Sequence, residues 1–129
     1  MKKVAINGFG RIGRAALKLI FETDDLEVVA INDLMSVENA AYLLKHDSNY
    51  GKYAKDVKFE GDSLFVGDKE IKYSSLRNIL ELPWKALNVD VVIESTGIFT
   101  NSADAEGHIL AGAKAAVISG PTKDTPTVV

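Results

Sequence analysis

Three glycines follow an apolar run near the start of the chain, in the segment GFGRIG at residues 8–13. The run before them, Lys3–Asn7, is typical of a short strand, and the pattern over residues 11–22 indicates a helix. The apolar, β-branched segment Leu26–Ile31 then predicts a strand buried on both faces. A strand, a glycine turn, a helix and a second strand within about 30 residues form a βαβ unit, and such a unit requires a parallel sheet.

Each glycine has its own reason to occupy this turn. Gly8 permits the tight turn, Gly10 allows a pyrophosphate to approach the backbone, and Gly13 allows the helix to pack closely on the strand. The free N–H groups at the helix start, near Arg11 and Ile12, favour an anion. The Arg11 guanidinium adds a positive charge there, although it could equally lie in solvent. The turn therefore predicts a dinucleotide with its pyrophosphate on the amino end of the first helix.

An acidic residue, Asp33, lies about 20 positions beyond the glycines, at the end of the second predicted strand. A carboxylate at this place can accept hydrogen bonds from both hydroxyls of an adenosine ribose, and it would repel a 2′-phosphate. Leu34, the next residue, brings no compensating charge. The pattern favours NAD over NADP. The alternative interpretation is that Asn32 and Asp33 are only a polar strand end.

The remainder of the chain continues the alternation of helices and strands. Ser36 can cap a helix over 36–44, with Asn39 at the position where a full capping box has Glu or Gln. Two Gly-Asp dipeptides within 57–73 predict short antiparallel strands joined by tight turns. The later part of the chain predicts a short helix at 75–80, a turn into a helical segment at 82–89, and a helix at 102–111. Asn101 or Ser102 would cap the last of these helices, and Gly112 would end it. We also expect strands at 90–94 and 115–119, and the start of another strand at 125–129.

Apolar residues in the first predicted helix recur at helical spacing. We expect Ile12, Ala16, Leu19 and Ile20 to share one face of that helix.

Strands that alternate with helices through short loops predict the fold class α/β. We expect a Rossmann-type, doubly wound, mostly parallel sheet with helices on both faces and a small antiparallel insertion, formed by residues 1–129 as one domain. Ligands of such sheets gather at the carboxyl ends of the strands, near the switch point. The informative strand exits are therefore residues 7–13, 32–34, 95–99 and 119–121.

Composition excludes several classes of function. The formal net charge is −3, which gives no electrostatic case for nucleic acid or for an anionic membrane. No apolar run approaches the roughly 18–20 residues that span a bilayer, and no signal peptide is recognised, so we expect a cytoplasmic protein. There is no cysteine, and the two histidines, His46 and His108, are far apart, so we expect no metal site.

Six segments occur in this order along the chain, the first of which contains the glycine turn: INGFGRIGR, INDL, LLKHDSNYGKY, LPWKAL, DVVIESTGIFT and GAKAAVISGPTKD. Together they closely resemble the amino-terminal, NAD-binding domain of phosphorylating glyceraldehyde-3-phosphate dehydrogenase. The resemblance covers essentially the whole chain and is far more specific than the glycine motif alone.

The resemblance implies further cofactor contacts at both ends of the dinucleotide. Asn7, Arg11 and Ile12 would lie along the pyrophosphate and the nicotinamide side, and Ser119 would approach the nicotinamide ribose unless it is an ordinary strand end.

At the adenosine end, Arg77 would approach the adenine largely through its backbone, unless it is a solvated surface arginine. Phe99 and Leu34 are plausible walls for the adenine ring, although Phe99 could be plain core. The strand-exit loop beside the adenosine would contain Ser95, Thr96, Gly97 and Phe99.

The resemblance also implies a reaction that this chain does not complete. In the family, a cysteine in a second domain forms a thiohemiacetal with the aldehyde, hydride passes to NAD, and phosphate resolves the thioester. The sequence contains no cysteine, so we expect no catalytic residue here, cofactor binding without catalysis, and a catalytic domain absent from the chain. The full glycolytic enzyme is expected to be a homotetramer.

Two other interpretations stay open. One is the corresponding domain of an erythrose-4-phosphate dehydrogenase, against which INDL and ESTG argue because that relative tends to vary there. The other is a stand-alone nucleotide-binding module without catalysis.

Overall fold

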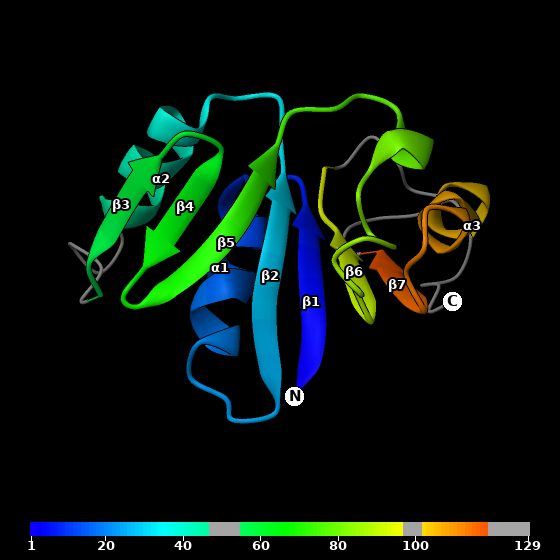
Figure 1. Ribbon diagram of the computed structural model, residues 1–129, viewed down its shortest axis with the longest axis horizontal. Helices are drawn as coiled ribbons and strands as arrows, with labels where there is room; N and C mark the ends of the chain where they lie inside the picture. The colour runs from blue at the N-terminus through cyan, green and yellow to red at the C-terminus, as the bar shows by residue number, and fades with distance from the viewer. Residues whose placement is uncertain (47–54, 97–101, 119–129) are drawn as a thin grey trace.

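The strands form one mixed sheet, in the order β3-β4-β5-β2-β1-β6-β7 (Figure 1). The computed structural model describes residues 1–46, 55–96 and 102–118, with side chains from 106 onward in the last range. The strands are β1 (Lys2–Asn7), β2 (Leu26–Asn32), β3 (Val57–Glu60), β4 (Ser63–Val66), β5 (Lys69–Ser74), β6 (Val91–Glu94) and β7 (Ala115–Ile118). The helices are α1 (Arg11–Ile20), α2 (Val37–Lys45) and α3 (Ser102–Leu110), with a 3-10 turn η1 (Ile79–Glu81).

The sheet is parallel at its centre and antiparallel at one edge. Strands β5, β2, β1, β6 and β7 run parallel to one another, whereas β4 is antiparallel to both β3 and β5 and forms a meander with them. The meander turns at Gly61 and Gly67, whose φ angles of 58° and 60° favour glycine. The predicted Rossmann-type sheet and its small antiparallel insertion are both confirmed.

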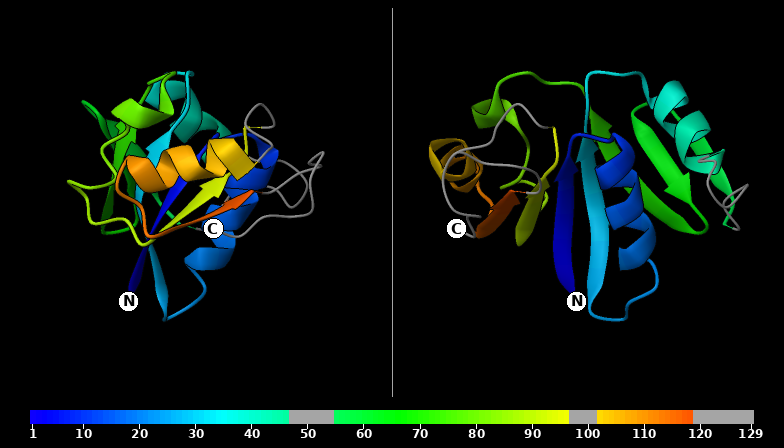
Figure 2. Two further views of the ribbon diagram at one scale, coloured as in Figure 1. Left: turned by 90° about the vertical axis from the view of Figure 1, so that its right-hand side faces the viewer. Right: turned by 180° about the vertical axis from the view of Figure 1, so that it is seen from behind.

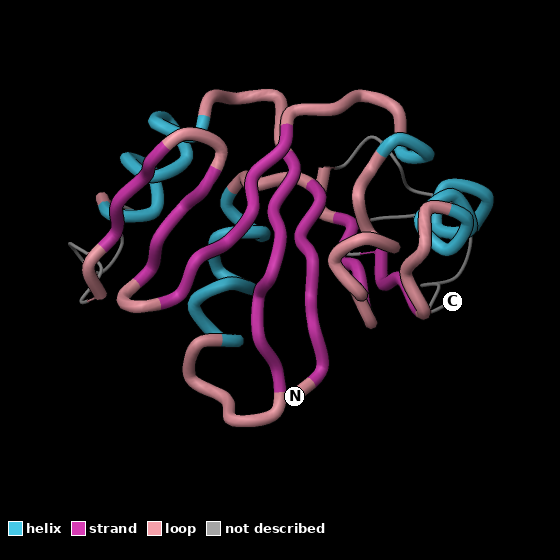
Figure 3. The backbone as a smooth tube through the Cα atoms, viewed as in Figure 1, coloured by secondary structure: helices cyan, strands magenta, loops and turns pink. Residues whose placement is uncertain are grey.

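Helices cover both faces of the sheet (Figure 2). Helices α1 and α2 pack with one hydrophobic cluster, which includes Phe9, Leu17 and Leu44. On the other face a second cluster, built around Trp84, joins η1 to β6 and β7. This arrangement is the doubly wound architecture, and it leaves the carboxyl edge of the central strands for the connecting loops (Figure 3).

The buried face of α1 differs from the predicted one. Its buried residues are Gly13, Leu17 and Ile20, whereas Ile12 and Leu19 are 54% and 64% exposed. Close packing of Gly13 on the strand fixes the rotation of the helix, and Ile12 and Leu19 lie one residue, or about 100°, around from that face. Of the predicted set, only Ile20 is fully buried.

The helix predicted at 75–80 is wrong, and so is the helical segment at 82–89. Residues 75–78 are irregular, Asn78 caps the single 3-10 turn η1, and a series of turns follows. The backbone N–H and C=O of Leu76 both bond to the side chain of Asn32, at 2.9 Å each. These backbone groups are therefore not available to a helix.

Two predicted helix boundaries are confirmed. The Ser36 hydroxyl accepts a hydrogen bond from the backbone N–H of Asn39, which caps α2. Gly112, with φ of 121°, donates its N–H to the carbonyl of Ile109 and ends α3. Of the two predicted caps of α3, Asn101 lies outside the described residues, and Ser102 is the first residue of the helix, with its side chain outside the described part. The strand predicted at 125–129 and the last residue of the strand predicted at 115–119 also lie outside the described residues.

Within the described part of the chain, no helix combines the length and apolar character needed to cross a membrane.

Candidate functional site

A cavity of about 420 Å³ opens at the carboxyl ends of β1, β2 and β6. It lies at the switch point of the sheet, because the chain goes from β1 to β2 on one side and later returns to β6 on the other. Its lining residues are Asn7, Gly8, Gly10, Asn32, Asp33, Leu34, Met35, Leu76, Arg77, Ser95 and Thr96.

The three glycines of the turn meet different constraints. Gly8 has a φ of 97°, and a Cβ there would lie 2.6 Å from the backbone nitrogen of Thr96. A Cβ on Gly13 would collide with the carbonyl oxygen of Gly8. A Cβ on Gly10, which lines the cavity, would meet nothing within 4 Å. Gly8 and Gly13 thus allow the turn and the packing of α1, while Gly10 leaves the backbone accessible from the cavity.

The amino end of α1 is suited to an anion. Gly10 is its N-cap residue and provides no side-chain cap, and the first turn contains no acidic residue. The first bond of the helix is donated by the backbone N–H of Arg14 to the carbonyl of Gly10. The preceding amides, of Arg11, Ile12 and Gly13, have no acceptor among the described residues. Arg11 and Ile12 are exposed beside this helix end.

Asp33, the acidic residue of the motif, is hydrogen-bonded to the glycine turn. One carboxylate oxygen, Oδ2, accepts the backbone N–H of Phe9 at 2.6 Å, and Oδ1 accepts that of Met35 at 3.0 Å. A carboxylate offers about four acceptor positions, so capacity remains toward the cavity that Asp33 lines. The arrangement can accept further hydroxyl donors while holding the turn in place.

Tyr73 is hydrogen-bonded to Met35, which lines the cavity beside Asp33. Its hydroxyl donates to the carbonyl of Met35 at 2.8 Å. Burial, followed by the negative charge of Asp33, raises the pKa of the Tyr73 hydroxyl, so this group stays a donor through the neutral range.

The opposite wall follows β6. The Ser95 hydroxyl donates to the carbonyl of Gly8 at 2.7 Å. The hydroxyl and the backbone N–H of Thr96 donate to Oε2 of Glu94, at 2.7 and 3.1 Å. The oxygen of the Ser95 hydroxyl can also accept hydrogen bonds.

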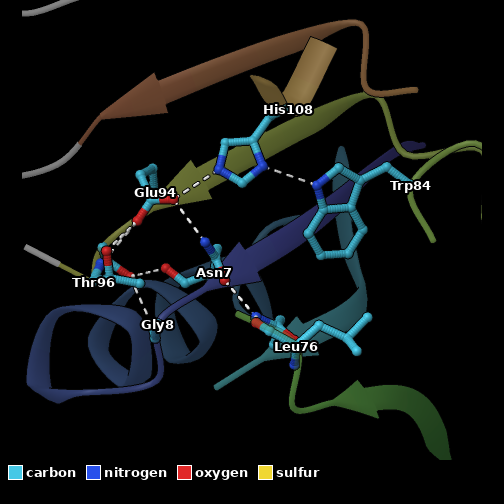
Figure 4. Close-up of polar contacts among 9 residues, drawn as sticks. Asn7, Gly8, Leu76, Trp84, Glu94, Thr96 and His108 are labelled. Atoms are coloured by element: carbon cyan, nitrogen blue, oxygen red, sulfur yellow. Dashed lines mark hydrogen bonds and ion pairs between the residues drawn. The ribbon is translucent and has the colours of Figure 1, made fainter. Parts of the chain in front are cut away.

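Glu94 is 1% exposed and lies behind this wall (Figure 4). Its Oε1 accepts the side-chain amide of Asn7 at 2.7 Å and lies 2.7 Å from Nε2 of His108. Trp84 donates its indole N–H to Nδ1 of His108 at 3.0 Å. The structure thus contains a buried carboxylate–imidazole–indole chain that ends at a residue of the cavity lining.

The structure brings together most of the predicted site residues. The predicted residues that line the cavity are Asn7, Gly8, Gly10, Asp33, Leu34, Arg77, Ser95 and Thr96. Arg11 and Ile12 lie outside the lining at the exposed helix start, and Gly13 is buried beneath the turn. Gly97, Phe99 and Ser119 lie outside the described residues.

Sequence analysis missed Asn32, Met35 and Leu76 in the lining, and Glu94 and His108 behind it. One signal was present: Asn7, Asn32 and Glu94 are the last residues of β1, β2 and β6, three parallel strands that are neighbours in the sheet. A polar residue that closes an otherwise apolar strand is a candidate for this edge of the sheet.

Among the described residues, no three His, Cys, Asp or Glu side chains lie close enough together to hold a metal ion.

The profile of one protein family, described as "Glyceraldehyde 3-phosphate dehydrogenase, NAD binding domain", matches residues 2–102. Similar curated relatives are named glyceraldehyde-3-phosphate dehydrogenase. The relative from Chlamydia pneumoniae is 53% identical over 129 residues, which is 98% of this chain and 38% of that protein. The relative from Thermotoga maritima is 50% identical over 95% of the chain and 38% of its own length. A relative named as cytosolic, from Trypanosoma brucei brucei, is 47% identical over 98% of the chain and 39% of its own length. The chain thus spans less than two fifths of these relatives.

Proposed function

The chain belongs to the family of glyceraldehyde-3-phosphate dehydrogenase NAD-binding domains, and we propose that the cavity at the ends of β1, β2 and β6 is its NAD site. One observation carries this assignment: the hydrogen bond from the backbone of Phe9 to Asp33 places the glycine turn and the acidic residue on one cavity. These two features recognise different ends of an adenosine diphosphate group.

The pyrophosphate is assigned to the amino end of α1. The amides of the first turn lack partners among the described residues, and the helix dipole favours negative charge there. Gly10 allows the closest backbone approach, because a side chain at this position would occupy the cavity. Arg11 lies at the same helix end and adds a positive charge, and Ile12 provides a backbone donor.

The adenosine is assigned to the Asp33 side of the cavity. The remaining acceptor positions of Asp33 suit the two hydroxyls of a ribose. Leu34 and Arg77 provide the surface against which an adenine would lie, and Ser95 and Thr96 form the facing wall. Contacts from Gly97, Phe99 and Ser119 remain predictions based on the family resemblance.

The reaction of the whole protein is a wider proposal that rests on the names of the relatives. We propose oxidation and phosphorylation of an aldehyde, glyceraldehyde 3-phosphate, in glycolysis in the cytoplasm, by a homotetramer in which a second domain supplies the catalytic cysteine. When bound, NAD supplies the hydride acceptor. The residues described here would hold and orient the dinucleotide, and the 129-residue chain, which has no cysteine, would not turn over the aldehyde.

Calorimetric titration of NAD into the 129-residue chain and its Asp33→Ala variant tests the site. We expect the substitution to weaken binding by about 1–3 kcal/mol, as for a lost hydrogen-bonded charged contact. The matched control is Asp24→Ala, at an exposed position on the loop that joins α1 to β2. The control should bind as the unsubstituted chain does. Equal affinity of the Asp33→Ala variant would remove Asp33 from the site, and no NAD binding by the unsubstituted chain would end the proposal.

A further inference from the structure

A row of polar side chains lies at one register on four neighbouring strands, and its two middle members, Asn7 and Asn32, line the cavity. Ser74 pairs with Asn32, Asn32 with Asn7, and Asn7 with Glu94. Their side chains are hydrogen-bonded in the same order: Ser74 Oγ to Asn32 Oδ1 at 2.7 Å, Asn32 Nδ2 to Asn7 Oδ1 at 2.8 Å, and Asn7 Nδ2 to Glu94 Oε1 at 2.7 Å. We call these four residues the polar row.

The direction of every bond in the polar row is fixed by groups that act in one way only. The backbone N–H of Leu76 donates to the side-chain oxygen of Asn32, so the NH₂ group of Asn32 faces Asn7. The oxygen of Asn7 therefore faces Asn32, and its NH₂ group faces Glu94. An ionised carboxylate only accepts, which matches its place at the end of this series.

A second series of donors reaches the same carboxylate from the other side. An indole N–H can only donate, so Nδ1 of His108, which accepts from Trp84, carries no proton. The proton of the neutral ring is then on Nε2 and is donated to Oε1 of Glu94. Trp84 and Glu94 thus select the same tautomer of His108, and all three side chains are at most 1% exposed.

Both series end at Glu94, and the polar row joins the two walls of the cavity. Oε2 of Glu94 holds the backbone and the hydroxyl of Thr96 on one wall. At the far end, Asn32 holds the N–H and the C=O of Leu76 on the other wall. Figure 4 shows Leu76 and Thr96 on either side of Asn7.

We propose that Glu94 is a positioning residue for NAD. It does not line the cavity. It fixes the orientation of the amides of Asn7 and Asn32, and through them it sets the positions of Thr96 and Leu76. Trp84 and His108 act on the cofactor only through this carboxylate. The inference rests on the proposed NAD site.

An amide of the same shape cannot replace this carboxylate. The NH₂ group of a glutamine would face donors on either side. His108 cannot become an acceptor at Nε2 while its Nδ1 accepts from Trp84, so the amide oxygen must stay toward His108 and Asn7. The NH₂ group then faces the backbone N–H of Thr96, which cannot reverse, and that wall must move.

The first test is NAD titration of the Glu94→Gln variant. The matched control is Glu27→Gln, because Glu27 lies near the amino end of β2, outside the cavity lining, and its side chain forms an ion pair with Lys69. We expect the Glu94→Gln variant to bind NAD about tenfold more weakly, and the control to bind within about twofold of the unsubstituted chain. In the absence of NAD, the backbone amide resonance of Leu76 should also shift in Glu94→Gln and not in the control. Equal affinity in a folded Glu94→Gln variant overturns the inference. If the unsubstituted chain binds no NAD, the proposed function fails instead.

The second test uses Trp84→Phe, which keeps the aromatic packing and does not alter the cavity lining. Imidazole nitrogen resonances should show Nδ1 as a hydrogen-bonded acceptor in the unsubstituted chain at neutral pH, and the Nδ1 resonance should shift in Trp84→Phe, where this nitrogen loses its donor. We expect NAD affinity to fall several-fold together with that change. A purely structural role would lower the melting temperature and leave the NAD affinity of the folded variant unchanged. That result contradicts the proposal, even if Glu94→Gln does not fold.

Discussion

Gly10 and Gly13 lie three residues apart, and glycine is needed at each of them for a different reason. A side chain at Gly13 would strike the backbone of Gly8, whereas a side chain at Gly10 would enter open space in the cavity. Gly13 therefore serves the packing of α1, and we expect Gly10 to serve binding.

We predict opposite effects for alanine at these two positions. Gly13→Ala should destabilise the chain by roughly 1–3 kcal/mol, because backbone atoms must shift. Gly10→Ala should cost less than about 1 kcal/mol of stability and yet weaken NAD binding. Urea unfolding and calorimetry on both variants check this, and a Gly10→Ala variant that binds NAD normally would contradict the placement of the pyrophosphate.

Asn7 illustrates how far residue-level reasoning reaches. The family resemblance indicated it as a cofactor contact, and it does line the cavity. Both ends of its amide are nevertheless engaged, by Asn32 and Glu94, which lie 25 and 87 residues away in sequence. No local pattern reports such partners, because they come together only when three strands align.

At the scale of elements, Asp90 joins the starts of three strands. Its Oδ2 accepts the backbone N–H of Lys3 at 2.8 Å, and its Oδ1 pairs with Nζ of Lys114 at 3.1 Å. Its own backbone carbonyl accepts the N–H of Ala115. The backbone N–H of Lys3, followed by the Lys114 side chain, holds the pKa of Asp90 below its ordinary value.

A lowered pKa in the folded state predicts a specific pH dependence. The stabilisation is present above the unfolded pKa of about 4 and is lost as pH falls through the lower folded pKa. We therefore expect Asp90→Asn to be less stable than the unsubstituted chain at pH 7, with the difference shrinking in more acidic solution. Urea midpoints measured down the acid range, with Asp24→Asn as the exposed control, check the sign. A difference that does not change with pH would show that the charge of Asp90 is not involved.

Element types were better predicted than element faces. The helix α1 was expected, but its rotation follows from the contact between Gly13 and Gly8, which a periodicity cannot report. The helix expected at 75–80 does not form, because a side chain from β2 takes the backbone groups of Leu76. In both places a tertiary contact decides over local propensity.

At the scale of the whole molecule, the chain spans 38% of the relative from Chlamydia pneumoniae. Contacts to the nicotinamide end of the cofactor are expected to come in part from the rest of such a protein. We therefore predict that the 129-residue chain binds NAD more weakly than a full-length relative and does not oxidise glyceraldehyde 3-phosphate.

Calorimetry on both proteins under one set of conditions, with an assay of NAD reduction, measures these quantities. Equal affinity would mean that the described residues make all the significant contacts, and turnover by the chain alone would exclude the need for a cysteine nucleophile.

The sequence by itself determined the βαβ unit, the parallel sheet with its antiparallel insertion, and the motif for a dinucleotide, because glycine spacing, apolar periodicity and turn residues act over short stretches of chain. Only the tertiary structure decided that Asn32 and Glu94 are hydrogen-bonded to Asn7, that Trp84 and Glu94 select the same tautomer of His108, and that Gly13 sets the buried face of α1. The physical reason is that a buried polar group takes its role from the partner that satisfies it, and these partners meet only when the strand ends lie side by side.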